Sequence, residues 1–288
     1  MLASLPIQRD SSGPDGGTGI DSPDIEPLPH WLTVPVHLHA AWASQRRGTS
    51  IAELYEALWG QYALFLYIRL QDDLLDRQQQ DLRLLFVADR FLVESLACVK
   101  DPQLWSFYNA RLKETVDGIL TVRRLEARAG AFTRQLLGLH AQVSGIFKVA
   151  ANSVSSMCGR PEEMSWISAF LDHLAVFSQI CDDVSDVVHD VEADRFTWVA
   201  NVLLQAGVEE NIGVDQRRER LADGLLREDR RTAVVDELRN VAQSAVSSVP
   251  PSAPPPIHDL AGGLRVKADE LDRMWHESGV RRVFAGVL

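Results

Sequence analysis

The sequence predicts an all-α protein, a single-domain helical bundle, and three observations support this fold class. Apolar residues recur at helical spacing through most of the chain. Alternating Val, Ile and Thr runs between Asn-Gly or Asp-Gly turns, which would indicate strands, are not found. The composition does not change between residues 30 and 248, and 46% of the 288 residues are hydrophobic, which is enough for one substantial core.

The N-terminal part of the chain differs from the rest. Residues 1–27 are rich in Ser, Gly, Pro and Asp, a composition that cannot offset the entropy of ordering, so we expect a disordered leader. The helical domain is therefore placed at 28–288. Its first element is expected to be a short helix over 31–42, interrupted at Pro35 because proline has no backbone N–H.

A long helix is expected next, and it leads to the first of two acidic stretches. Ser50 and Glu53 form a capping-box pattern that opens this helix. Residues 249–256 carry most of a proline cluster and predict a linker before the last helix. Further helices are expected over 82–99, 103–128, 132–157, 162–205, 214–247 and 258–284.

Charge and composition restrict the partners of the protein. The chain has 29 Lys and Arg against 40 Asp and Glu, and its net charge of −11 argues against a nucleic-acid partner. Its three cysteines show neither zinc-site nor disulfide spacing. No stretch approaches about 18 uninterrupted apolar residues, and no signal peptide is recognisable, so we expect no membrane span and a cytoplasmic location.

Two Asp-Asp-x-x-Asp motifs stand inside otherwise apolar helical runs, one at Asp72, Asp73 and Asp76 and the other at 182–186. Residues four apart share a helix face, so Asp72 and Asp76 lie side by side. Ionised carboxylates among apolar neighbours need a cationic partner. Hard divalent ions suit oxygen ligands, and Mg²⁺ typically combines one or two carboxylates with water and substrate phosphate oxygens. The motifs therefore predict a magnesium site that binds phosphate.

With these two motifs the sequence resembles the trans-isoprenyl diphosphate synthase family and, more broadly, the class I terpenoid synthase fold, over roughly residues 53–205. The second motif, with Gln179 three positions before Asp182, is similar to the second aspartate-rich motif of that family. The resemblance implies a cluster of up to three Mg²⁺ ions and an allylic isoprenoid diphosphate of C10 to C20, with farnesyl favoured. The implied metal ligands are Asp72, Asp76, Asp182 and Asp186, with Asp73 as a further catalytic acid.

The resemblance also implies residues that contact the substrate. Gln179 is expected near metal-bound water, and the expected diphosphate ligands are Arg195, Lys148, Arg134 and Arg77. Leu64 and Tyr67 precede the first motif, where the family limits the length of the hydrocarbon tail. Arg123 and Arg124 are expected on a solvated face.

Several departures from the family pattern concern positive charge. The Gly-Lys-Arg cluster before the first motif, the Arg pair after it and the central Lys-Thr pair are missing, so we expect few basic residues to bind a second diphosphate, that of isopentenyl diphosphate. We expect a prenyltransferase that uses another small-molecule acceptor. The alternatives are a class I terpene cyclase, a short-chain elongase, or an inactive subunit of a partner synthase. A homodimer is expected only because related synthases pair.

Overall fold

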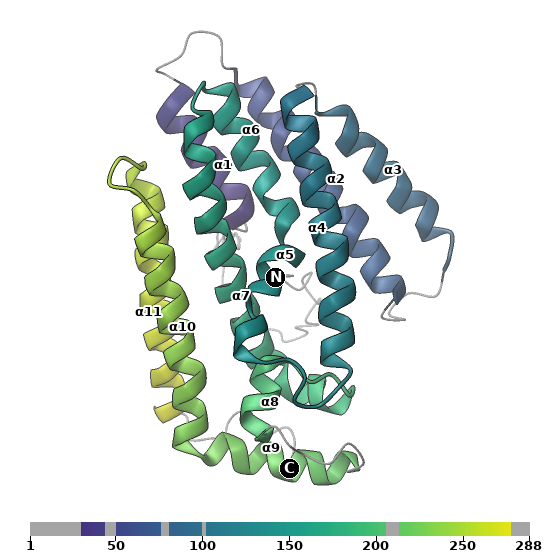
Figure 1. The fold of residues 1–288 in the computed structure, drawn as a ribbon, viewed down its shortest axis with the longest axis vertical. Coiled ribbons are helices and arrows are strands. Elements are labelled where there is room, and N and C mark those ends of the chain that lie inside the picture. Colours follow the sequence, from purple (N-terminus) through teal and green to yellow (C-terminus); the bar gives the residue numbers. More distant parts are fainter. Residues whose placement is uncertain (1–29, 44–49, 76–80, 100–101, 206–212, 278–288) are drawn as a thin grey trace, which may run out of the picture.

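The computed structural model describes residues 30–43, 50–75, 81–99, 102–205 and 213–277, and these form helices joined by short connections (Figure 1). This part of the chain contains no β-strand, and the predicted all-α, single-domain bundle is confirmed. The predicted leader lies outside the described residues. No described helix is both long and apolar enough to cross a membrane.

The α-helices follow one another up and down the bundle, and a final pair, α10 and α11, packs beside α7 (Figure 1). Their bounds are α1 His30–Trp42, α2 Ile51–Leu75, α3 Leu84–Ala97, α4 Pro102–Glu126, α5 Gly138–Val143, α6 Val149–Met157, α7 Met164–Glu192, α8 Trp198–Leu204, α9 Val214–Leu226, α10 Glu228–Ser248 and α11 Pro255–Glu277.

Helix α1 is continuous through Pro35, so the predicted interruption is wrong. Proline leaves the carbonyl four residues earlier without its helical donor, and here that carbonyl belongs to Trp31. The buried Gln61 of α2 supplies the missing bond, because its Nε2 donates to Trp31 O at 2.8 Å. Its Oε1 accepts from the backbone N–H of Ala150 in the first turn of α6, at 2.8 Å. One side chain thus provides hydrogen-bond partners for a backbone carbonyl of α1 and a backbone N–H of α6.

The predicted capping box at the start of α2 is confirmed. The backbone N–H of Ser50 donates to Glu53 Oε2 at 2.7 Å, and the backbone N–H of Glu53 donates to Ser50 Oγ at 3.2 Å. These reciprocal bonds satisfy two donors that a helix start leaves free. They fix where α2 begins, and therefore where it carries Asp72 and Asp73 of the first acidic motif, 22 and 23 residues after Ser50.

The expected helix over 132–157 is broken in the structure. Gly145–Lys148 forms a short 3-10 turn, η3, between α5 and α6. Thr115 of α4 joins the broken ends, because its Oγ1 donates to Gln142 O at 3.3 Å and accepts from the N–H of Ile146 at 3.2 Å. A side chain at Gly118 would lie 2.9 Å from the backbone of Val143, so glycine permits this close packing of α4 on α5.

Two other expected helices are also divided. The helix that carries the second motif ends at Glu192, and Asp194 adopts a left-handed φ of 58° before Thr197 caps α8 through the N–H of Ala200. The expected helix over 214–247 is split at Arg227, whose ψ of 115° is extended, into α9 and α10. After α10, the connection buries Val249 and Ala253 and is a packed turn.

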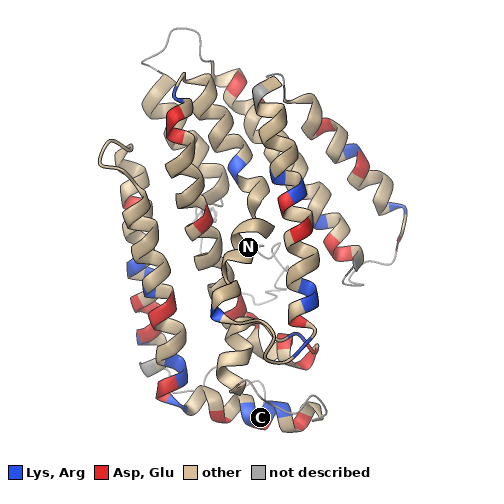
Figure 2. Cartoon of the chain, viewed as in Figure 1, with Lys and Arg blue, Asp and Glu red and all other residues tan. Residues whose placement is uncertain are grey.

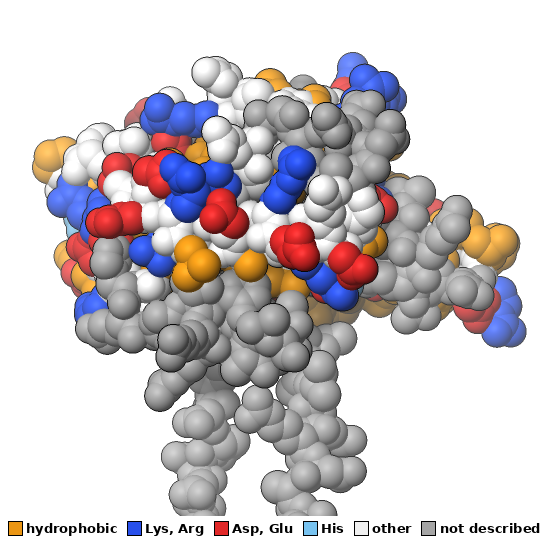
Figure 3. Space-filling view, turned by 90° about the horizontal axis from the view of Figure 1, so that it is seen from below, with side chains coloured by type: hydrophobic (Ala, Val, Ile, Leu, Met, Phe, Trp, Pro, Cys, Tyr) orange, Lys and Arg blue, Asp and Glu red, His pale blue; other side chains and the backbone are white. Residues whose placement is uncertain are grey.

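Two hydrophobic cores hold the bundle. The larger surrounds α7 and reaches α8, α10 and α11. The smaller lies among α2, α4, η3 and α6, where Leu64, Tyr108, Ile146 and Val149 are buried together. Helix α3 packs on α2 at the edge of the molecule (Figure 1). In the view from below, the part of the surface that projects on that side carries hydrophobic and charged side chains (Figure 3). In Figure 1 the C-terminal ends of α2, α4 and α7 all lie in the lower half of the bundle.

Candidate functional site

The first motif lies in the last turn of α2, and its carboxylates face arginines. Asp72 forms an ion pair with Arg123 of α4, and both side chains are partly buried. Asp73 pairs with Arg69 one turn earlier on α2, at 2.9 Å. The expectation that Arg123 lies on a solvated face is therefore wrong, whereas Arg124 is exposed as expected. Asp76 and Arg77 lie outside the described residues.

The second motif lies in α7, and its three aspartates have different surroundings. Asp183 is buried, Asp182 is half-buried and Asp186 is exposed. Gln179, one turn earlier, donates from Nε2 to Asp183 Oδ1 at 2.8 Å. Asp183 Oδ2 is buried and accepts no hydrogen bond from the described residues. Gln179 thus supports Asp183, and Asp186, predicted as a metal ligand, lies at the surface.

Burial raises the pKa values of two carboxyl groups on this helix, Asp183 and Asp190. Burial raises the pKa of Asp183 well above its ordinary range, the hydrogen bond from Gln179 opposes the shift, and the charges of Glu126, Asp190 and Asp182 add to it. Burial also raises the pKa of Asp190 to about 6, although Arg195 pairs with it at 2.6 Å and opposes the shift. The second motif would therefore gain from an additional positive charge.

The last turn of α4 connects the two motifs. Arg123 and Glu126 stand three residues apart and so share one face of this helix. Arg123 reaches Asp72 of α2, and Glu126 is close enough to raise the pKa of Asp183 of α7. Figure 2 shows charged residues of both signs in this lower part of the bundle. The last turn of α4 thus contacts Asp72 of the first motif, and its Glu126 lies within electrostatic range of Asp183 of the second.

The donor chemistry of this end suits a hard divalent cation. Its groups are carboxylate oxygens on two helices, one of them buried without a hydrogen-bond donor. Among the residues that the structure describes, no group of three or more His, Cys, Asp or Glu side chains is arranged to hold a metal ion. The described carboxylates are thus of the chemical type that binds Mg²⁺ but do not by themselves form a metal site, and Asp76 is outside this comparison.

The basic residues predicted to bind diphosphate have other partners. Arg195 pairs with Asp190 at the end of α7. The exposed Arg134 pairs with Glu237 of α10, at 2.5 Å from Nε to Oε2. Because both guanidinium groups already contact carboxylates, neither is an uncommitted cation for an anionic ligand.

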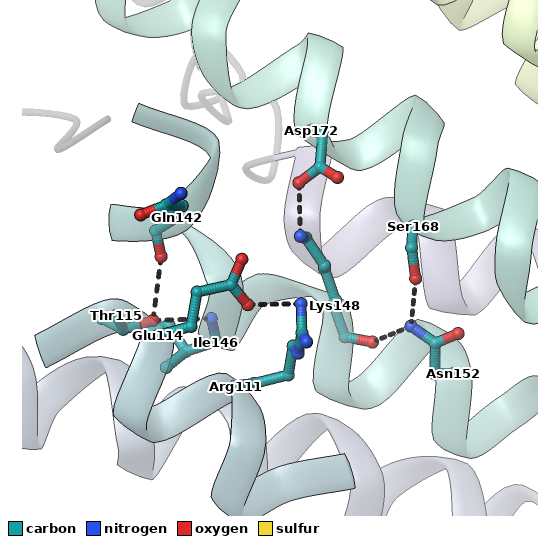
Figure 4. A network of polar contacts seen from close by, with 9 residues as sticks. All are labelled: Arg111, Glu114, Thr115, Gln142, Ile146, Lys148, Asn152, Ser168 and Asp172. Carbon is teal, nitrogen blue, oxygen red and sulfur yellow. Dashed lines mark hydrogen bonds and ion pairs between the residues drawn. The ribbon is translucent and has the colours of Figure 1, made fainter. Parts of the chain in front are cut away.

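Lys148, the third of these residues, belongs to a polar network at the helix break. Its side chain is buried and its Nζ pairs with Asp172 of α7 (Figure 4). The neighbouring Arg111 pairs with Glu114 on α4. Asn152 Nδ2 donates to the carbonyl of Lys148 at 2.8 Å and to Ser168 Oγ at 3.2 Å. Each charge drawn there has an opposite charge beside it, which is typical of a structural network.

The two residues predicted to limit the hydrocarbon tail lie in the smaller core. Leu64 is fully buried, and Tyr67 is half-buried against the same cluster. A cavity of about 200 Å³ lies beyond them, lined by Gly60, Tyr108 and Val149 among others. Gly60 precedes Asp72 by twelve residues, or about 18 Å along the helix, so this cavity is far from the first motif.

Arg123 and Glu126 were not predicted from the sequence as neighbours of the motifs. Their spacing of three residues at the end of an expected helix was visible, but only the packing of α4 shows which side chains they approach.

No protein-family model matches this chain, and a search of curated proteins likewise finds no match.

Proposed function

We propose that this protein is a Mg²⁺-dependent enzyme that ionises an allylic isoprenoid diphosphate and transfers the prenyl group to an acceptor other than isopentenyl diphosphate. The observation that supports this function best is that the last turn of α4 carries residues that act on both acidic motifs. Arg123 approaches the first motif there, and the charge of Glu126 acts on Asp183 of the second.

The proposed metal ligands are Asp72, Asp76 and Asp182, with Asp183 and Asp186 as neighbouring carboxylates. Bound Mg²⁺ would supply positive charge to the diphosphate as it leaves, which is a large electrostatic effect in such reactions. The unpaired Oδ2 of Asp183 and its raised pKa favour a cation near this helix. Gln179 would keep Asp183 oriented through its existing hydrogen bond.

Arg123 is proposed to exchange partners. Without a cation it neutralises Asp72. If Asp72 turns to a metal ion, the guanidinium is released beside the site, and its fork of N–H donors suits diphosphate oxygens. The residue would thus stabilise the empty site in one state and the leaving group in the other.

The hydrocarbon tail is proposed to lie against the smaller core, with Leu64 and Tyr67 limiting its length. These apolar side chains would exclude water that could otherwise quench a carbocation.

The preference for an acceptor other than isopentenyl diphosphate follows from the pairing of the basic residues. Lys148, Arg195 and Arg134 are engaged with Asp172, Asp190 and Glu237, so a second diphosphate would have to compete for each of them.

The test is diphosphate release from geranyl, farnesyl and geranylgeranyl diphosphate with Mg²⁺, with and without isopentenyl diphosphate and with prenyl acceptors such as phenols and phosphoglycerates. We expect release that requires both the metal and an added non-isopentenyl acceptor. Asp72→Asn and Asp182→Asn should each reduce it by a factor of about 100 or more. Asp89→Asn, at an exposed site on α3, should leave it unchanged.

The other outcomes identify the alternatives. A hydrocarbon formed from the allylic diphosphate alone would indicate a terpene cyclase, and consumption of isopentenyl diphosphate would indicate an elongase. If no substrate releases diphosphate, and if Asp72→Ala and Asp182→Ala leave binding to a partner synthase intact, the chain is a silent subunit. Any of these results would reject transfer to another acceptor.

A further inference from the structure

The cavity of about 200 Å³ lies among α2, α3, α4 and α6, near the upper end of the bundle in Figure 1 and in the half of α2 that precedes the first motif. Much of its wall is apolar, formed by Ala57, Val99, Leu104, Val149 and Met157. A cavity of about 150 Å³ is large enough for benzene. This cavity can therefore hold a single ring with a short side chain.

Two buried hydroxyl groups in the wall form a hydrogen-bonded chain with a fixed direction. Ser95 Oγ donates its single hydrogen to the carbonyl of Gly60 at 2.6 Å. In the contact between Tyr108 Oη and Ser95 Oγ, at 2.9 Å, the tyrosine is therefore the donor. Burial raises the pKa of Tyr108 to about 12, so the phenol keeps this hydrogen at neutral pH. Both oxygens offer a ligand lone pairs only.

The other polar side chains of the wall are also engaged as donors within the protein. Ser153 Oγ donates to the carbonyl of Val149 at 2.8 Å, and Cys98 Sγ donates to that of Glu94 at 3.4 Å. The amide of Gln61 is held at both ends, by α1 and α6. The hydroxyl and thiol hydrogens of the described wall are thus used within the protein. A ligand that bonds to these groups has to supply the hydrogen atoms.

Two carboxylates add negative charge to the wall. Glu53 is exposed and Glu56 is half-buried, whereas Ser95 and Tyr108 are fully buried, so the carboxylates lie toward the opening. An anion such as a diphosphate would meet acceptor oxygens and like charge here. An ammonium group carries three donors, no acceptor and a positive charge, and it matches these surroundings.

The spacing of the two ends sets the length of the ligand. Glu56 precedes Gly60 by four residues, which is about 6 Å along α2. Ser95 contacts the carbonyl of Gly60, and Tyr108 lies next to Ser95. A benzene ring with a two-carbon chain spans a similar length, so one molecule can reach the carboxylates with its chain and the buried oxygens with its ring.

We propose that this cavity binds a small aromatic amine whose ring carries a hydrogen-bond donor. The ammonium group faces Glu56 at the opening, the ring lies against Leu104 and Val149, and the ring donor approaches the oxygens of Tyr108 and Ser95. Gly60 precedes Asp72 by about 18 Å along α2, so the amine occupies a site separate from the acidic motifs. The proposal does not depend on the proposed enzymatic function.

Isothermal titration calorimetry of the full chain with four matched probes tests the proposal. Tyramine has both the ammonium group and the ring hydroxyl, and we expect a Kd of about 0.1 to 1 mM for this small ligand. 2-Phenylethylamine lacks the hydroxyl and 4-ethylphenol lacks the ammonium group, so each should bind at least about fivefold more weakly. 4-Hydroxyphenylacetate, which carries a carboxylate in place of the amine, should not bind up to about 10 mM.

Variants assign the two ends of the ligand. Tyr108→Phe should remove the advantage of tyramine over 2-phenylethylamine, and Glu56→Gln should weaken tyramine about threefold or more while leaving 4-ethylphenol unchanged. Ser153→Leu should weaken all probes, because its larger side chain enters the cavity. Asp89→Asn, which removes an exposed carboxylate of α3 outside this wall, is the control and should change nothing. Circular dichroism verifies that each variant is folded.

Several results would overturn the proposal. They are absence of tyramine binding up to about 10 mM, equal affinity for all four probes, tighter binding of 4-ethylphenol than of tyramine, and an unchanged preference for tyramine in folded Tyr108→Phe. Diphosphate release plays no part in these measurements. Failure of the amine site and failure of the proposed enzymatic function are therefore distinguishable.

Discussion

The helix break at η3 and the end of the bundle that carries the acidic motifs both contain buried charged groups, but their charges are balanced differently. At the break, Lys148 pairs with Asp172 and Arg111 pairs with Glu114. At the acidic end, Asp183 is buried with an amide donor and with other carboxylates nearby. In the first region each of these charges has an opposite charge beside it, whereas the second region would be stabilised by a bound cation. Charge balance therefore separates a structural network from a candidate site.

The largest expected effect concerns the charge balance at the helix break. Asp172→Ala leaves the buried Lys148 without its partner and should lower the free energy of unfolding by about 3 kcal/mol. The double variant Lys148→Met/Asp172→Ala should recover most of this loss, because the unpaired charge is removed. Urea denaturation of the two single variants and the double variant measures the coupling. Strictly additive losses would show that the pair is not coupled.

A second prediction concerns His140 of α5, near the break. Burial lowers the pKa of His140 to about 4, from about 6.5 in an unfolded chain. Between these values the unfolded state binds the proton and the folded state does not, so stability falls as the pH drops from about 6.5 to about 4. The loss should approach about 3 kcal/mol.

His140→Leu should remove this pH dependence, and urea unfolding at several pH values measures it. The raised pKa values of Asp183 and Asp190 act in the opposite direction, because the folded state then holds the extra protons. Comparison of the variant with the parent isolates the histidine. An unchanged pH dependence would show that His140 is accessible to protons in the folded state.

The third prediction tests the charge imbalance of the second motif. Asp183→Asn keeps the acceptor for Gln179 and removes the buried charge, so without metal it should raise the free energy of unfolding at pH 7 by about 1 to 2 kcal/mol. The gain should shrink as the pH falls and Asp183 becomes protonated. The exposed Asp186→Asn is the matched control and should change stability little. If Asp183→Asn lowered the free energy of unfolding, it would contradict the inferred charge imbalance at Asp183.

The smallest expected effect concerns Arg123. Arg123→Gln releases Asp72, so the protein without diphosphate should bind Mn²⁺, a spectroscopic substitute for Mg²⁺, up to about ten times more tightly, or about 1.4 kcal/mol. Electron paramagnetic resonance measures the free ion. Arg124→Gln removes the same charge from an exposed neighbour and should have a smaller effect. Equal effects would assign the change to net charge and not to the ion pair.

Much of the fold and the position of the motifs could be predicted from local pattern. Helical periodicity gave the all-α class, and the capping box located the start of α2 because both of its bonds lie within four residues. The breaks in the long helices could not be predicted. They depend on side chains distant in sequence, such as Thr115 at η3 and Gln61 opposite Pro35.

Local pattern was enough to predict that two acid-bearing helices belong to one bundle and which residue types they present. The packing of the helices sets which charged groups are buried and what contacts them. Asp183 has one oxygen without a donor, Asp72 contacts Arg123, and Lys148 pairs with Asp172. The physical reason is that a spacing of four residues fixes a shared face of one helix. The burial and partners of that face depend on neighbours that pack from elsewhere in the chain.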